Sequence, residues 1–586
     1  MSEVVGAKAL VEAAMSEGMV RVLPRALAAA DPLVRRSDRT DYQSNAALGL
    51  AKQAGLAPRD LARSLLDALA APEGADFEVE LSGPGFLNIT LADPALWQVV
   101  AARLADDRLG VGRPLAGART LVDYSGPNIA KQLHVGHIRS TVIGDALVRI
   151  LTYLGAEVAR ANHLGDWGTS FGKLIQYLGE HAELDLEAGL DLDALDSLYK
   201  AAQQQFTADP EFADRARACV VGLQSGDEAA LAVWRKLIEV STAAFQDVYE
   251  RLGVLLTPED AAPESFYNPW LDEVVAELGA KGLLAESEGA QCVFLDGFEN
   301  AAGEPFPLLV RKSDGGYGYA ATDLAAVRHR VRDLKATRIL YVIDARQAQH
   351  LRMVFATARK AGWLPVEVEV VHVPFGTILG TDGRPFKSRS GDTPRLKELL
   401  DDAIAGARAV VADKSPDLPP EELERVVQAA GIGAVKYADL SNARVKDYVF
   451  DPERMVSLAG NTSVYLQYAH ARACSVLSKL PPPLGEEGAA TVDPSVPIHR
   501  AERALILALD EFGAVLAEVA ETLEPHRLCT YLFELAKAFS DFWQNCPVLK
   551  ADDAARRGNR AALVRLTGRT LAQGLDLLGI EAPRRL

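Results

Sequence analysis

Residues 120–163 read TLVDYSGPNIAKQLHVGHIRSTVIGDALVRILTYLGAEVARANH, and three patterned segments follow one another in this stretch. TLVDYS predicts a short strand that ends in polar residues. The segment 139–155 predicts a helix that Gly155 stops, because its apolar residues recur at helical spacing. AEVARANH predicts a second strand. The helix should bury the face made of Ile143, Ala146, Leu147, Ile150, Leu151 and Leu154. Strand, helix and strand in this order indicate an α/β domain built on a parallel sheet.

The remaining chain divides into segments of different pattern around this unit. RILYVIDA (338–345) and PVEVEVVHVPFG (365–376) predict further strands of the sheet, buried on both faces, with a helix at 351–363 between them. Before the unit, DDRLGVGRPLAGAR (106–119) is typical of a linker, and a mixed segment ending in strand-like residues precedes it. After about residue 395 the pattern is mostly helical, with a proline-rich break at 480–497. The order is therefore α+β, then α/β, then all-α.

Composition limits the classes of protein to which the chain can belong. Its 586 residues are too many for one core, and 49% hydrophobic with 24% charged residues is typical of a soluble globular protein. A net charge of −18 excludes nucleic-acid binding by bulk charge, so any such partner needs a local basic face. The five cysteines are scattered, which predicts neither zinc nor disulfides and favours a reducing compartment. We also expect no signal peptide and no membrane span.

The motif HVGH (134–137) lies where the first strand passes to the first helix, and ligands of open α/β sheets bind at such strand ends. A helix N-terminus favours phosphate, and Gly136 leaves room for it. His134 and His137 are three residues apart and should project to one side, where imidazole N–H groups can stabilise an oxyanion. Helix capping or a surface position is the alternative for both. A metal site is not expected, because no third ligand lies at a recognisable spacing.

The longer string YSGPNIAKQLHVGH (124–137) resembles the signature of class I aminoacyl-tRNA synthetases, in the form found in arginyl-tRNA synthetases. The resemblance runs from about residue 120 to the C-terminus, whereas the first hundred residues match only loosely, as an extra tRNA-binding domain would. It continues in ANHLGDWGTSFGKLI (161–175), YGYAATDLAA (317–326), YVIDARQAQHLRMVF (341–355), GRPFKSRSGDT (383–393), GNTSVYLQYAHAR (460–472) and the closing LLGIEAP.

The resemblance implies an arginine–tRNA ligase that joins L-arginine to tRNA(Arg) through arginyl-adenylate, in protein synthesis. The implied fold is an α/β Rossmann-type catalytic domain with an N-terminal α+β domain and a C-terminal helical bundle. The implied substrates are arginine, tRNA(Arg) and ATP with Mg²⁺, with no other cofactor, no DNA and no membrane, and the implied state is a cytoplasmic monomer. The expected domains are 1–110 (tRNA-contacting), 120–395 (catalytic, with an insertion at about 180–300), 396–455 (helical connector) and 456–586 (anticodon-binding).

The resemblance also implies roles for single residues. Those that match the ATP-side signature are Lys131, His134, Gly136 and His137. Asp123 matches an acid that holds the α-ammonium group of arginine. Asn128 and His134 match residues at the polar end of the amino acid. The guanidinium group needs fixed carboxylates, and the matched motifs offer Asp323 and Glu264 for this, with Tyr319 packed alongside and Gln347 as a further contact.

The second class I signature, K-M-S-K-S, departs from its pattern here. The loop reads PFKSRSGD (385–392), and the second lysine of the signature falls on Ser388, or on Lys387 if the alignment shifts by one. The resemblance implies that Lys131 compensates for the missing charge. Lys387 and Arg389 remain alternative contributors.

Aromatic residues in the C-terminal third are candidates for stacking on tRNA bases, although most aromatic residues at helical spacing pack in the core. We predict Tyr465 and Tyr468 as tRNA contacts, with Tyr531 and Trp543 as further candidates. The family often closes in Met, whereas this chain closes in Leu586.

Three other functions are weighed against this one. A class I synthetase for another amino acid, such as cysteine or glutamine, is disfavoured by the scattered cysteines and by the acid pair. A small-molecule nucleotidyltransferase with an H-x-G-H site leaves the helical third unexplained. A catalytically silent RNA-binding relative is disfavoured by the intact Lys131, His134, His137 and Asp323.

Overall fold

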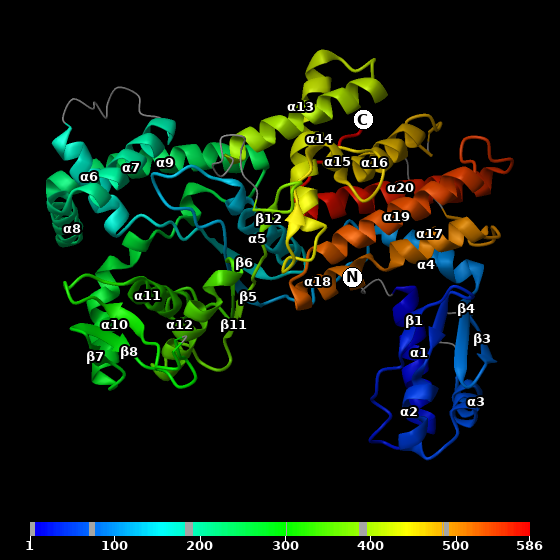
Figure 1. Cartoon of the computed structure of the whole chain (residues 1–586). Coiled ribbons are helices and arrows are strands. Elements are labelled where there is room, and N and C mark those ends of the chain that lie inside the picture. Colours follow the sequence, from blue (N-terminus) through cyan, green and yellow to red (C-terminus); the bar gives the residue numbers. More distant parts are fainter. Residues whose placement is uncertain are drawn as a thin grey trace.

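The computed structural model describes residues 6–69, 77–181, 192–300, 302–385, 395–482, 484–485 and 492–586 (Figure 1). Its centre is a four-stranded sheet in the order β11-β10-β5-β6, and every neighbouring pair is parallel. The strands are β5 (Arg119–Asp123), β6 (Glu157–Ala161), β10 (Arg338–Tyr341) and β11 (Glu369–His372). The expected parallel α/β sheet is therefore confirmed, with β5 at an inner position.

Helix α5 (Val135–Tyr153) leads away from β5 and begins four residues before the segment in which helical spacing was recognised. Its end agrees with the prediction, because Leu154 is the C-cap and Gly155 has a φ of 99°. The helix is buried on nearly all sides rather than on one face. Helices α13 (Leu396–Lys414), α14 (Pro420–Leu440), α18 (Phe512–Thr522) and α20 (Ala554–Leu577) contact it, so the C-terminal helices cover the side that an isolated α/β domain would leave exposed.

Two expectations about the strands were wrong. The strand in RILYVIDA ends at Tyr341, four residues before the predicted end. Strand β11 is not buried on both faces, since Glu369 is exposed and the other residues of the strand are only partly buried. The reason is its place at the edge of the sheet, where it pairs with β10 alone.

The chain between β6 and β10 forms helical and mixed insertions. Figure 1 shows the helices α6 to α9 (cyan) as a group that projects from the sheet, with the mixed group around α10 and α11 (green) beside it. The elements are α6 (Thr169–Glu180), α7 (Leu192–Ala208), α8 (Pro210–Ser225), α9 (Glu228–Leu252), η1 (Pro258–Asp260), η2 (Glu264–Tyr267), α10 (Asn268–Ala280), β7 (Ala285–Ser287), β8 (Ala290–Val293), β9 (Leu308–Arg311) and α11 (Tyr319–Arg332). After β10 come η3 (Ala345–Gln347), α12 (Ala348–Lys360) and β12 (Ile378–Leu379).

The N-terminal domain has the expected α+β composition and an antiparallel sheet in the order β1-β2-β4-β3. Its elements are α1 (Ala7–Val22), β1 (Val34–Arg36), β2 (Tyr42–Ser44), α2 (Ala46–Ala54), α3 (Pro58–Ala68), β3 (Phe77–Ser82), β4 (Phe86–Leu91) and α4 (Asp93–Ala105). A buried ion pair between Arg103 and Asp510, 2.6 Å long, joins α4 to the C-terminal helices. Only the last residue of the predicted linker (106–119) belongs to β5. The linker packs against the rest of the protein, because Leu109 and Val111 are buried.

The C-terminal third is helical, as predicted (Figure 1, yellow to red). Its elements are α13 (Leu396–Lys414), α14 (Pro420–Leu440), β13 (Tyr448–Val449), α15 (Pro452–Met455), α16 (Ser463–Leu477), α17 (Arg500–Asp510), α18 (Phe512–Thr522), α19 (His526–Asn545) and α20 (Ala554–Leu577). Within the described residues, strand β13 pairs with β12 alone. Within the described part of the chain, no helix is long and apolar enough to cross a bilayer.

Candidate active site

The two histidines of HVGH form the start of α5. His134 is the N-cap, and its Nδ1 accepts a hydrogen bond of 3.0 Å from the backbone N–H of Gly136. The Nδ1 of His137 accepts a bond of 3.1 Å from the backbone N–H of His134. The two ring centroids are 3.9 Å apart, so both rings lie on one side, as predicted. A Cβ on residue 136 would lie 2.8 Å from the ring of His134, which is why glycine stands there.

These contacts determine which proton each ring can offer. A neutral imidazole whose Nδ1 accepts a hydrogen bond carries its proton on Nε2. Burial, with the nearby His134 adding to it, lowers the pKa of His137 to about 3. Burial and the charge of Lys131 lower the pKa of His134 as well. Both rings are therefore neutral near pH 7 and carry their proton on Nε2. Each side chain can cap the start of α5 through Nδ1 and at the same time donate a hydrogen bond to a ligand through Nε2–H.

The loop between β5 and α5 carries the other residues of the signature. The side chain of Asn128 lies against residue 165, where a Cβ would be 2.1 Å from its Oδ1, so Gly165 makes room for it. The backbone N–H of Ile129 donates to the carbonyl of Gly165 at 3.0 Å, which joins this loop to the one after β6. The ammonium of Lys131 lies 4.8 Å from the ring centroid of Tyr199, on α7.

The predicted acid pair lies on two different elements. Glu264 begins η2, and its backbone N–H donates to the carbonyl of Leu164, which places it beside the loop after β6. Burial, with the charges of Asp166 and Asp323 adding to it, raises the pKa of Glu264 to about 8. The two predicted carboxylates are thus close enough to repel each other.

Asp323, in the second turn of α11, is hydrogen-bonded to the Nε2 of His350 at 2.6 Å. Burial opposes its ionisation, but the hydrogen bond from His350, together with the charges of His350, His163 and Arg330, lowers the pKa of Asp323. Asp323 is therefore an anion near pH 7, whereas Glu264 is mostly protonated. A cation placed between them would favour the ionised form of Glu264, so the pair suits a cationic ligand.

The third predicted acid, Asp123, ends β5 and is buried. Its Oδ2 accepts a hydrogen bond of 2.6 Å from Arg330, whose side chain is equally buried. The role of Asp123 toward an α-ammonium group stays a prediction, with one of its oxygens already bonded to a cation. Tyr319, one helical turn before Asp323, is 72% exposed, and Gln347 is exposed at the end of η3.

The described residues of the candidate site gather at one edge of the sheet. Asp123 and the signature loop follow β5, residues 163–166 follow β6, and Gln347 and His350 follow β10. This is the carboxyl end of the parallel strands, as expected for ligand binding. Lys387, Ser388 and Arg389 lie outside the described residues. Among the described residues, no group of His, Cys, Asp and Glu could hold a metal ion.

Sequence patterns did not single out His163, Asp166, Arg330 and His350 as site residues. Asp166 accepts a bond of 2.9 Å from the backbone N–H of Ser265, next to Glu264, and burial raises its pKa to about 6. His163, Asp166 and His350 stand inside quoted motifs, at 161–175 and 341–355, and position in those motifs was the available signal. Arg330 lies just past the motif at 317–326 and had no such signal.

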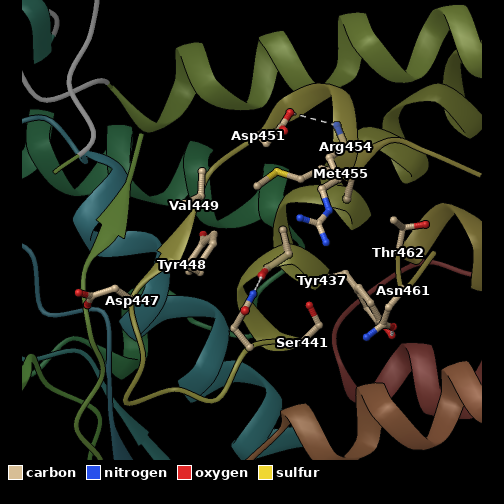
Figure 2. A pocket seen from close by; sticks show the side chains of 13 residues that line it. Tyr437, Ser441, Asp447, Tyr448, Val449, Asp451, Arg454, Met455, Asn461 and Thr462 are labelled. Atoms are coloured by element: carbon tan, nitrogen blue, oxygen red, sulfur yellow. Dashed lines mark hydrogen bonds between the residues drawn. The ribbon is translucent and has the colours of Figure 1, made fainter. Parts of the chain in front are cut away.

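Several cavities among the described residues lie away from the acid pair, and two of them are at the C-terminal helices. One, of about 430 Å³, opens between α14, β13, α15 and the start of α16, and the predicted arginine and ATP residues do not line it (Figure 2). The other, of about 350 Å³, is lined by Tyr468, Trp543 and Leu586. The basic side chains that line this second cavity are Lys414, Arg472, Lys479, Arg584 and Arg585. These side chains form a local basic face, which is the feature that the net charge of the chain requires of any nucleic-acid site.

The four aromatic candidates of the C-terminal third divide into two groups. Tyr468 and Trp543 line the basic cavity. Tyr531 is 7% exposed and stacks on Phe512, so it belongs to the core. Tyr465 is partly buried with its ring edge toward Phe533.

Comparison with known proteins agrees with this arrangement. Three family models match: the arginyl-tRNA synthetase N-terminal domain (residues 8–91), the class I (R) tRNA synthetase catalytic domain (100–452) and the DALR anticodon binding domain (466–586). An arginine–tRNA ligase from Frankia casuarinae is 58% identical over 98% of both chains. One from Thermobifida fusca is 50% identical over 95% of both.

Solved structures show the same similarity. The arginyl-tRNA synthetase of Thermus thermophilus superimposes with a TM-score of 0.81 at 26% identity, covering 99% of this chain and 100% of the other. That of Plasmodium falciparum superimposes with a TM-score of 0.82 at 25% identity, covering 98% of both. Family models, full-length relatives and fold all coincide, and the chain therefore belongs to the arginyl-tRNA synthetase family.

Proposed function

We propose that this chain joins L-arginine to tRNA(Arg) in two steps, using ATP with Mg²⁺ as the substrate complex. The α-carboxylate of arginine attacks the α-phosphorus of ATP and displaces pyrophosphate, which forms arginyl-adenylate. A hydroxyl of the terminal ribose of tRNA then attacks the arginyl carbonyl and displaces AMP. The similarity to arginine–tRNA ligases over nearly the whole chain carries this proposal, and the carboxyl groups of Glu264 and Asp323 at the carboxyl end of the sheet offer a place for a cationic side chain.

The arginine side chain binds between Glu264 and Asp323. A guanidinium group is planar and presents several N–H donors in a fixed fork, which two carboxylates on different elements can engage together. His350 holds the Asp323 carboxylate in place through its 2.6 Å hydrogen bond. Tyr319 and Gln347 complete the pocket, while Asn128, His134 and Asp123 orient the α-amino and carboxylate groups.

ATP binds at the start of α5. The Nε2–H groups of His134 and His137 stabilise charge that develops on the phosphate oxygens during the attack, and the helix N-terminus adds its partial positive charge. Gly136 lets the phosphates approach the backbone. Lys131 supplies the charge for which the loop at 385–392 has no aligned second lysine, and Lys387, Ser388 and Arg389 of that loop contact the phosphates.

The basic cavity around Tyr468 and Trp543 receives an unstacked base of the tRNA, with Tyr465 nearby on the same helix. The domain limits 1–110, 120–395, 396–455 and 456–586 are part of this proposal, with the insertion at about 180–300. The family-model spans 8–91 and 466–586 fall within the first and last of these domains, and the span 100–452 runs across the other two. We further propose that the protein acts as a monomer in the cytoplasm, where its five free cysteines stay reduced.

Pyrophosphate exchange into ATP, measured with each standard amino acid and with or without total tRNA, tests the proposed function. Of the standard amino acids, only arginine is expected to support exchange. Dependence on tRNA would show that activation is coupled to tRNA binding, and exchange without tRNA would show that it is not. Exchange with another amino acid would contradict the assignment of Glu264 and Asp323. No exchange at all would favour a silent RNA-binding relative.

Arginine binding should tighten as the pH rises from 6.5 to 8.5. A guanidinium group binds the ionised form of Glu264, whose pKa of about 8 leaves it mostly protonated below that value. Binding then has to remove a proton, so the Kd for arginine should fall about tenfold or more over this range. Calorimetry in buffers of different ionisation enthalpy measures both the Kd and the proton released. The Glu264→Gln variant should bind arginine more weakly. If its Kd for arginine still depends on pH as steeply as in the wild type, the proton released on binding belongs to Asp166 or His350.

Tyr468→Ala should raise the KM for tRNA roughly tenfold, because stacking of a base on an aromatic ring contributes about 1–3 kcal/mol. The KM for ATP in the same assay should stay unchanged. Tyr468→Phe keeps the ring and is the matched control, with nearly wild-type KM expected. Equal effects of the two substitutions would mean that the hydroxyl, and not the ring face, contacts the tRNA.

A further inference from the structure

The loop between β5 and α5 contains two non-glycine residues with left-handed backbone, Ser125 with a φ of 71° and Ala130 with a φ of 60°. An L-residue in this region loses free energy to the clash of its Cβ with the backbone, so the conformation persists only where neighbouring groups impose it. Asn128 lies between the two positions and Lys131 directly follows the second. The neighbours that impose the conformation therefore determine where two proposed substrate-binding side chains lie.

At the first position the neighbour is Tyr249, near the end of α9. Its hydroxyl lies 2.8 Å from the Oγ of Ser125 and accepts a bond of 3.1 Å from the side-chain amide of Asn162. The same Asn162 accepts from the backbone N–H of Gly126 at 3.0 Å. Tyr249 is 3% exposed, and burial raises its pKa to about 12, so its hydroxyl keeps its proton.

The hydroxyl groups around Ser125 form a connected chain of hydrogen bonds. The hydroxyl of Thr141 is the donor toward both the carbonyl of His137, at 2.8 Å, and the Oγ of Ser125, at 3.0 Å. The chain runs from Asn162 through Tyr249, Ser125 and Thr141 to the backbone of His137. Each link strengthens the next in such a chain.

At the second position the neighbour is Ser241, two turns earlier on α9. Its Oγ accepts a bond of 3.1 Å from the backbone N–H of Ala130 and donates to the carbonyl of Leu237 at 2.7 Å. Ser241 is completely buried. Ser241 and Tyr249 of α9 thus hydrogen-bond to the two left-handed residues of the loop.

We infer that Ser241 and Tyr249 are positioning residues for arginine activation, because they hold both ends of the signature loop in the conformation that presents Asn128 and Lys131 to the substrates. Helix α9 belongs to the helical insertion, so the insertion becomes part of the activation machinery. The inference rests on the proposed function, in which Asn128 meets arginine and Lys131 meets the phosphates. Neither Ser241 nor Tyr249 needs to touch a substrate.

Ser241→Ala and Tyr249→Phe test this inference in the full-length protein. Each removes one hydroxyl and leaves a buried polar partner without its bond, so kcat/KM for arginine in pyrophosphate exchange should fall about tenfold. Thr242→Val is the matched control, because Thr242 makes the same kind of bond to the carbonyl four residues earlier, at 2.8 Å, from the neighbouring position on α9. Its kcat/KM should stay unchanged, because this hydroxyl bonds to carbonyls of its own helix and not to the signature loop.

Glycine at the strained position provides the decisive comparison. Ala130→Gly removes the cost of the left-handed backbone, so the double variant Ser241→Ala, Ala130→Gly should regain at least half of the lost activity on a logarithmic scale. Recovery would support the inference. Values of kcat/KM within twofold of the wild type in both single variants, or a loss that Ala130→Gly leaves unchanged, would overturn it. Arginine-dependent exchange by the wild type tests the proposed function separately, because it does not depend on any of these variants.

Discussion

Asp323→Asn is expected to lower kcat/KM for arginine by about 10²-fold or more in pyrophosphate exchange. Removing one member of a buried charge pair costs about 2–5 kcal/mol, because the other charge is left without a partner. Asparagine keeps the size of the side chain and can still bond to His350, so the loss reports the missing negative charge rather than a cavity. With Glu264 alone, the pocket cannot engage both sides of the guanidinium fork.

Asp333→Asn is the control for this substitution. Asp333 follows the same helix but lies at the surface, where it pairs with His329 and Arg332. Surface pairs of this kind contribute little, so its kcat/KM should match the wild type. The ratio of kcat/KM for arginine to that for lysine should fall in Asp323→Asn and not in Asp333→Asn. A loss below fivefold for arginine in Asp323→Asn would remove this residue from the pocket.

His137→Ala and His137→Asn should both reduce the rate of adenylate formation by about 10²-fold or more, by analogy with the loss of an oxyanion donor. They differ in what they do to the helix. The side-chain oxygen of asparagine occupies the place of Nδ1 and can still accept from the backbone N–H of His134, so the start of α5 is kept. Alanine loses both the cap and the donor. Single-turnover measurement of adenylate separates the chemical step from product release.

Two further measurements give this prediction its controls. The Kd for tRNA should stay within about twofold of the wild type, because His137 lies at the ATP side of the site. His137→Gln places an amide N–H near the position of Nε2 and should retain more activity than His137→Asn. Normal adenylate formation in His137→Asn would exclude the Nε2–H donor from the mechanism and leave His137 with its capping role alone.

The local features of the fold were predictable because they depend on neighbours in the sequence. The alternation and helical spacing of apolar residues located β5, α5 and β6, and Gly155 ended the helix at the predicted place. HVGH was correctly placed at the passage from strand to helix, since a strand and its following helix share one short connection. The motif order from 124 to 472 identified the family without any structure.

Only part of the acid site could be predicted from the sequence in the same way. With 80 acidic residues in the chain, acidity selects none of them, and motif position alone pointed to Glu264 and Asp323. Their mutual repulsion was not predictable, because η2 and α11 meet only after η2 has packed beside the loop that follows β6. The bond between Asp123 and Arg330 spans 207 residues and has no periodic signal.

The sequence by itself determined the element types, their order, the position of the signature histidines and the family. The tertiary structure alone decided which strand became an exposed edge, which buried charges became partners, and which helix holds the signature loop. The physical reason is the distance along the chain over which each effect acts. Apolar periodicity acts over one or two helical turns, whereas burial and electrostatic partners depend on segments that meet only when the whole chain has packed. Ser241 and Tyr249, more than a hundred residues from the loop they contact, are of the second kind.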